Sequence, residues 1–229
     1  MVKLKDYLSS NEYPGRGIVI GTSPSGSIAI AYFIMGRSVN SRNRVFVADG
    51  DGIRTEAKDP SKLVDPSLII YAPVRVVDNN TIVTNGDQTD TVRDFLLEGK
   101  SFEEALETRC YEPDEPNFTP RISGMITRNE TGFTYKLSIL KHNEGECERI
   151  FWNYESTPGA GRIIHTYDHD GNPIPSFSGD PVEVEIPDSI ENFTSELWEN
   201  LNEDNKVSLF VRYIDIKSGI SATKLINKF

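Results

Sequence analysis

The sequence predicts an α+β protein built on antiparallel sheets. Two observations carry this prediction: apolar, β-branched runs come in hairpin pairs, and stretches with helical spacing come in adjacent pairs between them. A regular alternation of strands and helices, which would indicate a parallel sheet, does not occur in the sequence. Neither an internal repeat nor a flexible linker divides the 229 residues, so we expect one domain over 1–229.

The first hairpin is expected within residues 17–35, where two apolar runs flank a turn rich in Ser, Pro and Gly. The runs 17–21 and 27–35 are nearly continuous rather than alternating, which is typical of strands in a sheet covered on both faces. Asp78-Asn79-Asn80 is expected to form a second tight turn. Further strands are expected at 44–48, 68–77 and 81–84.

Helical spacing begins at Gln88 and continues to Glu107. Its apolar positions are Val92, Phe95, Leu96 and Leu106. Asp87 or Thr89 is expected to cap a first helix, and Ser101-Phe102-Glu103-Glu104 matches a capping box that would open a second one.

A Pro-rich linker at 111–120 precedes the next strands. The segment 132–140 alternates apolar and polar residues, and 129–132 is expected to turn the chain before it. A loop-rich stretch is expected at 156–187. The remaining elements are expected as strands at 122–127 and 132–140, a helix at 195–201 and a closing strand at 207–216.

The chain carries 24 Lys and Arg against 35 Asp and Glu, a formal net charge of −11. This balance argues against a nucleic-acid binder and an anionic membrane surface, because both require a basic face. A small anionic ligand is still compatible with it, since a few arginines focused in a cleft can outweigh the global charge locally.

The longest strongly apolar stretch, Ile28 to Met35, is far shorter than the roughly 20 residues that span a bilayer. The first residues lack the apolar region of a signal peptide, so we expect a cytoplasmic protein. Cys110 and Cys147 are the two cysteines, too few for a disulfide framework or a four-thiolate zinc site, and we expect free thiols.

Three arginines interleaved with Ser and Asn follow the second apolar run: Arg37, Arg42 and Arg44. Guanidinium groups offer forked donors to phosphate or carboxylate, so this cluster is a candidate anion cradle. A solvated turn explains the pattern equally well, and the sequence leaves both interpretations open.

Two further segments are candidate sites. Asn85 to Asp90 lies where a strand meets a helix, so its glycine and the helix N-terminus could contact a ligand, although a turn with an N-cap is the simpler interpretation. Asp114 to Ile122 gathers carboxylates, an amide, a hydroxyl and an arginine in a Pro-stiffened loop. As an acidic connector this loop would be unremarkable.

Two motifs point to cofactors only weakly. His165 and His169, with aspartates nearby, could ligate a metal. Asp168 to Pro173 has the composition of a turn, however, and we expect no metal. Gly159-Ala160-Gly161-Arg162 lacks the length and the lysine of a phosphate loop, so ATP is not indicated. We expect no cofactor.

Five motifs in series resemble the archaeal-type IMP cyclohydrolase family. They are 13–17, the 32–44 stretch with its arginine cluster, Tyr71 followed by Arg75, 85–90, and 117–122. The sequence departs from the archaeal pattern in extra residues within the arginine cluster, in Gln88 where that pattern has His, and in the segment from Pro158 to Pro181.

The resemblance implies a four-layered αββα sandwich of antiparallel sheets like that of the N-terminal-nucleophile hydrolases. It implies chemistry without a nucleophile at residue one, and Met1-Val2 offers neither a hydroxyl nor a thiol there. The implied reaction is dehydrative ring closure of formamidoimidazole carboxamide ribotide (FAICAR) to IMP in purine biosynthesis. The implied partner is therefore a small purine ribotide, and the oligomeric state, a homo-oligomer included, is left open.

By this resemblance, three residues carry the chemistry. Arg37 orients the reacting oxygens, Tyr71 transfers a proton, and Glu115 accepts the amide proton. The residues expected to bind the ribose phosphate, or to make polar contacts around it and the base, are Arg42, Arg44, Arg121, Asn85, Gly86, Thr89 and Asn117. A purine-ribotide binding protein without activity and an amide hydrolase on the same scaffold are the alternative functions.

Overall fold

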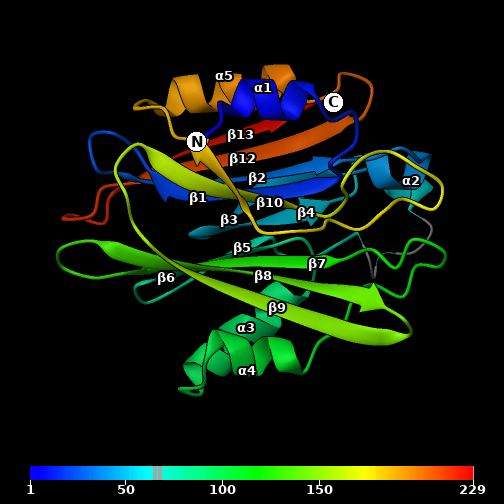
Figure 1. Cartoon of the computed structure of the whole chain (residues 1–229), viewed down its shortest axis with the longest axis horizontal. Helices are drawn as coiled ribbons and strands as arrows, with labels where there is room; N and C mark the ends of the chain where they lie inside the picture. Colours follow the sequence, from blue (N-terminus) through cyan, green and yellow to red (C-terminus); the bar gives the residue numbers. More distant parts are fainter. Residues whose placement is uncertain (64–65, 67–68, 229) are drawn as a thin grey trace.

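Two antiparallel sheets face each other across the middle of the molecule (Figure 1). The computed structural model describes residues 1–63, 66 and 69–228. The six-stranded sheet has the order β11-β10-β1-β2-β12-β13. Its strands are β1 (Arg16–Thr22), β2 (Ile28–Met35), β10 (Ala160–His165), β11 (Val182–Glu185), β12 (Lys206–Ile214) and β13 (Ser221–Asn227).

The seven-stranded sheet takes its strands in chain order, from β3 to β9. Each strand therefore pairs with its neighbour along the chain, which requires only hairpin connections or an inserted helix pair. The strands are β3 (Val45–Asp49), β4 (Gly52–Glu56), β5 (Val74–Val77), β6 (Asn80–Thr84), β7 (Arg121–Arg128), β8 (Phe133–Asn143) and β9 (Glu146–Glu155).

Helices pack on the outer faces of both sheets (Figure 1). α1 (Leu4–Ser9) and α5 (Ile190–Asn200) cover the six-stranded sheet, with Leu8, Phe193 and Leu197 in their contact. α3 (Gln88–Leu97) and α4 (Phe102–Glu107) cover the seven-stranded sheet. Two short elements, α2 (Val39–Arg42) and the 3₁₀ helix η1 (Pro60–Lys62), lie in connections.

β1 and β2 show why the apolar runs of the first hairpin are continuous. In β2, Ile28, Ile30 and Tyr32 point into the core between the sheets. Ala29, Ala31 and Phe33, on the opposite face, contact the helix layer. Both faces are covered, as the sequence predicted, so neither needs a polar residue.

Several sequence predictions are confirmed. The first hairpin, the strands at 44–48, 81–84, 122–127, 132–140 and 207–216, and the paired helices all form. The capping box at the second helix is present, because the Ser101 and Glu104 side chains bond each other's backbone N–H. Asp87 occupies the cap position of α3, but its carboxylate bonds Arg121 and Arg109 rather than the helix N-terminus. Thr89 lies inside the helix.

Other predictions need correction. The strand expected at 68–77 begins at Val74, and residue 68 lies outside the described residues. The stretch 156–187, expected as loop, carries β10 and β11, whose pairing to β1 the local pattern could not reveal. α5 begins at Ile190 rather than at residue 195, because Ser189 caps it. The elements α1, α2, β4, β9 and β13 were not predicted from the sequence.

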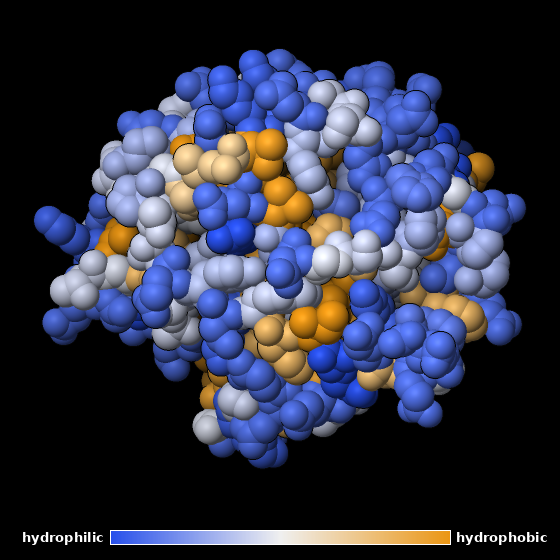
Figure 2. Space-filling view, viewed as in Figure 1, coloured by the Kyte–Doolittle hydropathy of each residue, from blue (hydrophilic) through white to orange (hydrophobic). Residues whose placement is uncertain are grey.

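Most of the face seen in Figure 2 is hydrophilic, with apolar side chains showing near its middle. Such scattered apolar exposure is ordinary for a folded protein with a strong net charge. None of the helices in the described part of the chain has the length and hydropathy to cross a membrane.

A buried histidine ties α1 to the six-stranded sheet. His165, the last residue of β10, is 1% exposed. Its Nε2 lies 2.6 Å from the Tyr7 hydroxyl, and its Nδ1 lies 2.9 Å from the Tyr167 carbonyl oxygen. Because a carbonyl can only accept, Nδ1 carries the proton and Nε2 accepts from Tyr7. Burial lowers the pKa of His165 from 6.5 to about 4.

This pKa shift predicts a loss of stability in acid. The folded state holds His165 neutral, so its stabilising contribution is complete above pH 6.5 and is lost as the pH falls toward about 4. The shift corresponds to about 3 kcal/mol of unfolding free energy. Urea unfolding between pH 7 and pH 4 should give a shallower pH dependence for His165→Gln than for the wild type. His169→Gln, at an exposed position, is the control and should keep the wild-type slope; equal slopes for all three proteins would contradict the prediction.

Candidate functional site

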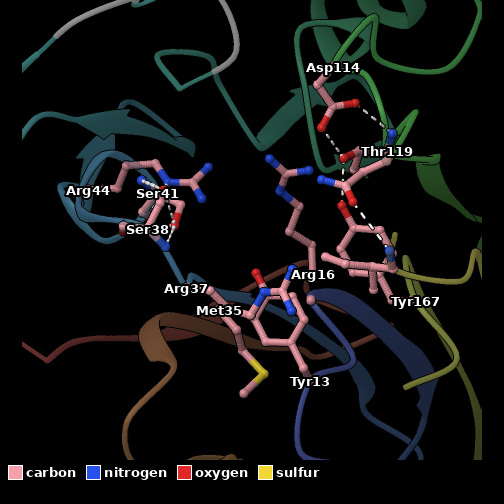
Figure 3. A pocket seen from close by; sticks show the side chains of 13 residues that line it. Tyr13, Arg16, Met35, Arg37, Ser38, Ser41, Arg44, Asp114, Thr119 and Tyr167 are labelled. Carbon is pink, nitrogen blue, oxygen red and sulfur yellow. Dashed lines mark hydrogen bonds between the residues drawn. The ribbon is translucent and has the colours of Figure 1, made fainter. Parts of the chain in front are cut away.

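A pocket of about 220 Å³ opens beside the start of β1 and the end of β2 (Figure 3). Its walls come from four segments that are separate in sequence: the start of β1, the end of β2 with the turn around α2, the loop 111–120, and the chain after β10. The lining residues are Tyr13, Gly15, Arg16, Met35, Arg37, Ser38, Ser41, Arg44, Asp114, Asn117, Thr119, Tyr167 and Ile174.

Arg16 and Arg44 direct their guanidinium groups into this pocket (Figure 3). Arg44 is 2% exposed, and its Nε donates to the Ser41 carbonyl oxygen at 2.9 Å. No acceptor among the described residues bonds its buried Nη1. Burial lowers the pKa of Arg44, and the neighbouring charge of Arg16 lowers it further. A buried donor without a partner is costly, so an anion bound here would relieve a strained electrostatic arrangement.

Glu112 is the carboxylate that faces Arg16. One Arg16 nitrogen, Nη1, lies 3.4 Å from Oε1 and 3.3 Å from Oε2 of Glu112, whose side chain is 2% exposed. Burial raises the pKa of Glu112, while Arg16 and then Arg121 oppose the shift. The Glu112 N–H also donates to the Thr119 carbonyl oxygen, which fixes the loop. Asp114, on the same loop, lines the pocket and raises the pKa of Glu112 further, so two carboxylates lie near the Arg16 and Arg44 guanidinium groups.

A pair of tyrosines is buried beside the arginines. The Tyr32 and Tyr71 hydroxyl oxygens are 2.7 Å apart. Burial raises the pKa of Tyr71, and Arg44 and Arg16 oppose this shift. The Tyr71 N–H donates to Thr55 Oγ1 at 2.9 Å, which anchors its backbone to β4. The phenol therefore stays protonated near neutral pH and can serve as a proton donor.

The opposite wall is aromatic and well anchored. Tyr13 and Tyr167 stack with centroids 5.9 Å apart and planes inclined by 17°. The Tyr167 hydroxyl bonds Thr119 Oγ1 at 2.5 Å, and Thr119 in turn bonds the Asp114 carboxylate. Gly15 has φ +78°, and a Cβ there would come within 2.5 Å of the Tyr167 ring. The tight approach explains why glycine occupies this position.

Arg37 stands at the pocket mouth. Its guanidinium carbon lies 5.0 Å from the centre of the Tyr13 ring, a cation–π contact. It also pairs with Asp170 and donates to the Gly171 carbonyl oxygen at 3.0 Å. Arg37 thereby links the loop after β10 to the end of β2.

The structure brings together some of the predicted site residues. Arg37, Arg44 and Asn117 all line the pocket, and Tyr71 lies next to it beside Arg44. Glu115 is exposed on the same loop and is not a lining residue.

Arg42 points away from this pocket. Its Nε donates to the Gly36 carbonyl oxygen at 2.8 Å and its Nη2 to Asn205 Oδ1 at 3.0 Å. Its guanidinium is therefore already bonded at the end of β2, and it lines a separate shallow depression with Lys58 and Lys62.

The residues predicted at the strand–helix junction form hydrogen bonds with one another and with the neighbouring strand. Asn85 bonds the Pro120 carbonyl and the Ile122 N–H, joining β6 to β7. Thr89 bonds Thr84 and the Gly86 carbonyl. Arg121 Nη1 donates to Asp87 and Gln88, each at 2.7 Å, although its buried Nε has no partner among the described residues.

Gly86 leaves the space that Arg121 occupies. A Cβ on Gly86 would come within 2.4 Å of Arg121 Nη1. The junction therefore positions the Arg121 charge behind Glu112, whose pKa it lowers, and none of these residues lines the pocket.

Several residues of the site were given no role from the sequence. Tyr13, Arg16 and Tyr167 line the pocket, and so do Asp114 and Thr119 of the candidate segment 114–122. Glu112 is buried against Arg16. Arg16 belongs to the first of the family-like motifs, and Glu112 lies three residues before Glu115. These were the available signals, but only the fold shows which carboxylate turns inward.

The two histidines weighed as metal ligands do not converge. Both ring nitrogens of His165 bond protein groups, whereas His169 is exposed and contacts the Asp170 carbonyl. Among residues 1–63, 66 and 69–228, no group of three or more His, Cys, Asp or Glu side chains could hold a metal ion.

The fold and the pocket define an α+β protein with a small pocket lined by guanidinium groups, phenol groups and a carboxylate. Residues 13–219 match the family model described as "IMP cyclohydrolase-like protein". The chain belongs to this family.

Curated archaeal proteins named IMP cyclohydrolase are similar to this chain. The Methanopyrus kandleri protein is 31% identical over 182 residues, which cover 72% of this chain and 89% of the relative. The Methanosphaera stadtmanae protein is 30% identical, over 69% of this chain and 74% of the relative. The Methanocaldococcus jannaschii protein is 28% identical, over 79% of this chain and 87% of the relative.

Proposed function

We propose that this protein is an IMP cyclohydrolase that closes the second purine ring of FAICAR to give IMP and water. The observation that carries the proposal is the arginine-lined pocket, with Arg44 Nη1 buried and unbonded among the described residues, in a chain of the IMP cyclohydrolase-like family. A ribotide phosphate supplies the anion that such a pocket lacks.

The proposed reaction has two steps. The carboxamide nitrogen attacks the formyl carbon, so a C–N bond forms, that nitrogen loses one proton and the formyl oxygen becomes a hydroxyl. The carbinolamine then loses this hydroxyl as water while the formamido nitrogen gives up its proton. Both reacting groups belong to one molecule, so the enzyme mainly holds the near-attack conformer and moves protons.

Arg44 is the proposed phosphate ligand, with Arg16 beside it. Arg44 presents an unpartnered donor, and its lowered pKa reports an environment that favours a bound negative charge. Arg37, already paired with Asp170 at the mouth, is proposed to orient the substrate oxygens as the pocket fills. Asn117 offers an amide on the same wall. We assign Asn85, Gly86, Thr89 and Arg121 a positioning role behind Glu112.

Glu112 is the proposed proton acceptor. It is buried, hydrogen-bonded to Arg16 and next to the pocket, whereas Glu115 is exposed. A carboxylate with a raised pKa is a better base once ionised, and the nearby arginines keep the ionised form accessible. Glu115, the acceptor implied by the family resemblance, remains the alternative.

Tyr71 is the proposed donor to the formyl oxygen. Its hydroxyl is protonated near neutral pH and is paired with that of Tyr32, so a proton that leaves Tyr71 can be replaced from its neighbour. Arg residues orient but hardly transfer protons, because their pKa exceeds about 12.

We further propose that the two sheets and their outer helices form the four-layered αββα sandwich of the N-terminal-nucleophile hydrolases, as one domain. The helix pairs on both outer faces support this assignment. A cytoplasmic location fits an acidic enzyme that acts on a small phosphorylated metabolite.

The direct test is turnover. Purified protein mixed with FAICAR, with no metal or nucleoside triphosphate added, should produce IMP, measured by its ultraviolet absorbance and by chromatography. Saturable FAICAR binding without IMP would instead indicate a ribotide-binding protein. Release of formate or ammonia would indicate an amide hydrolase, and either result overturns the proposal.

Two arginines of one cluster provide a matched test of the phosphate contact. Arg44→Gln should raise KM for FAICAR by about 10- to 100-fold, the loss expected for a charge-assisted contact of roughly 1.5–3 kcal/mol. Arg42→Gln removes the same charge from a side chain that points away from the pocket and bonds the Gly36 carbonyl. This variant should leave KM near the wild-type value. A KM effect confined to Arg42→Gln would show that the phosphate binds elsewhere.

The two glutamates of the 111–120 loop, Glu112 and Glu115, are the candidate bases, and their variants can be compared. Glu112→Gln should lower kcat by about 10²- to 10⁴-fold, the usual contribution of general acid–base catalysis. Burial raises the pKa of Glu112 above 4.5, the ordinary pKa of a glutamate carboxyl. As the pH is lowered, the wild-type rate should therefore begin to fall before the pH reaches 4.5.

Glu115→Gln is the control for this prediction. It should keep both the rate and the acidic limb of the profile, since its side chain is exposed, whereas that of Glu112 is buried against Arg16. The reverse pattern, with Glu115→Gln inactive and Glu112→Gln active, would assign the base to Glu115.

A further inference from the structure

A second pocket, of about 190 Å³, lies between the two sheets at the opposite end of β2. The first pocket includes Met35, the last residue of β2, and the second includes Ile28, its first residue. In Figure 1, β2 runs toward α2, so the second pocket lies at the end of the sheets away from α2. Its lining residues are Ile28, Asp51, Val76, Asp78, Asn79, Thr81, Ile126, Arg128, Arg212, Ile214, Gly219 and Ser221.

Arg212 enters this pocket from β12 and is 7% exposed. Its Nε donates to Thr223 Oγ1 at 2.9 Å, and its Nη1 donates to the Asp51 carbonyl oxygen at 2.6 Å. Both acceptors are neutral. Burial lowers the pKa of Arg212, and the Asp51 charge only opposes this shift from a distance. A nearly buried cation therefore lacks a carboxylate within ion-pair distance in the described chain.

Arg128 enters the same pocket from β7. It donates to the Ile216 carbonyl oxygen at 3.1 Å and to Asn79 Oδ1 at 3.3 Å, again neutral acceptors. A Cβ on Gly219 would come within 2.9 Å of Arg128 Nη2, so glycine there leaves room for the guanidinium.

The presence of two arginines in one pocket is unusual for so acidic a chain. Carboxylates outnumber Lys and Arg by 35 to 24, yet two guanidiniums share a pocket without an ion pair to any described residue. Arg44, in the first pocket, shows the same lack of a carboxylate partner. Both ends of the sandwich thus hold guanidinium groups that have no ion pair to a described residue and could bind an anion.

The rest of the lining restricts the chemistry of the ligand. Thr81, Ser221 and Asn79 add hydroxyl and amide groups, and Asp51 and Asp78 add carboxylates. A bare anion would be repelled by the two aspartates. A phosphate ester that also carries hydroxyl groups would satisfy both sets, since its phosphate can accept from the arginines and its hydroxyls can donate to the aspartates.

We propose that this second pocket is a binding site for a small hydroxyl-bearing phosphate monoester of the size and chemistry of a pentose phosphate. The phosphate lies between Arg128 and Arg212, the hydroxyls face Asp51 and Asp78, and Ile28, Ile126 and Ile214 pack against the carbon skeleton. The site is separate from the proposed reaction and does not require that reaction to occur.

Ribose 5-phosphate is the probe, titrated into the full chain by isothermal calorimetry. The titrations use the Arg44→Gln background, so that binding in the first pocket is weakened. We expect saturable binding to one site, with ribose showing none and inorganic phosphate binding more weakly. Adding Arg128→Gln should weaken the affinity at least about tenfold, as expected for loss of a charge-assisted contact.

Arg149→Gln is the matched control. Arg149 is also without a carboxylate partner among the described residues, but it is exposed and donates only to the Cys147 and Arg109 carbonyls. It removes the same charge and should leave the affinity unchanged. Arg212→Gln should match Arg128→Gln; thermal unfolding checks that it folds, and Arg128→Gln alone carries the test if it does not.

The outcomes distinguish this proposal from the proposed reaction. FAICAR turnover by the Arg128→Gln protein, with Arg44 intact, should equal that of the wild type whether or not the second site exists. No ribose 5-phosphate binding in the Arg44→Gln background overturns the second site. So does equal weakening by Arg128→Gln and Arg149→Gln, because that result would reflect net charge alone. Phosphate binding as tightly as ribose 5-phosphate would overturn the assigned ligand class.

Discussion

Burial of positive charge at the end of the two sheets is the constraint on which the site depends. Arg16 and Arg44 are held close together, and desolvation and mutual repulsion both lower the pKa of Arg44. Glu112 pairs with Arg16, and burial raises the pKa of Glu112 although Arg16 opposes the shift. Arg44 forms no ion pair with a described residue, so an anion bound in the pocket would complete its hydrogen bonding.

Rigid elements maintain this unfavourable arrangement. Arg16 opens β1, which lies between β10 and β2 in the six-stranded sheet, and Tyr71 is fixed to β4 through Thr55. The loop that carries Glu112 is bonded through Thr119 to Tyr167. The apolar cores between and outside the sheets supply the stability, so the pocket can keep groups that would otherwise separate. At the far end of the same sheets, the second pocket likewise holds two arginines, Arg128 and Arg212, without an ion pair to a described residue.

The sequence determined those elements whose signal is local. Covered strands need apolar residues on both faces, and 17–35 shows this pattern without reference to any partner. The capping box at Ser101 and Glu104 closes within four residues, so it too could be predicted. β9 and β13 at the sheet edges, and β11 beyond β10, carry mixed polar sequences. Their strand character comes from pairing with distant neighbours, which the local pattern does not contain.

For the site, the sequence determined the chemical types and the family. An arginine cluster, family-like motifs and an acidic Pro-rich loop could all be recognised in the sequence. Of the residues predicted there, Arg37, Arg44 and Asn117 do line one pocket. Only the tertiary structure decided that Glu112 rather than Glu115 turns inward, because the direction of a loop side chain depends on what the loop packs against. Charge compensation likewise depends on the tertiary structure. Neighbours from other strands, far away in sequence, decide whether an arginine is buried and whether it has a counterion.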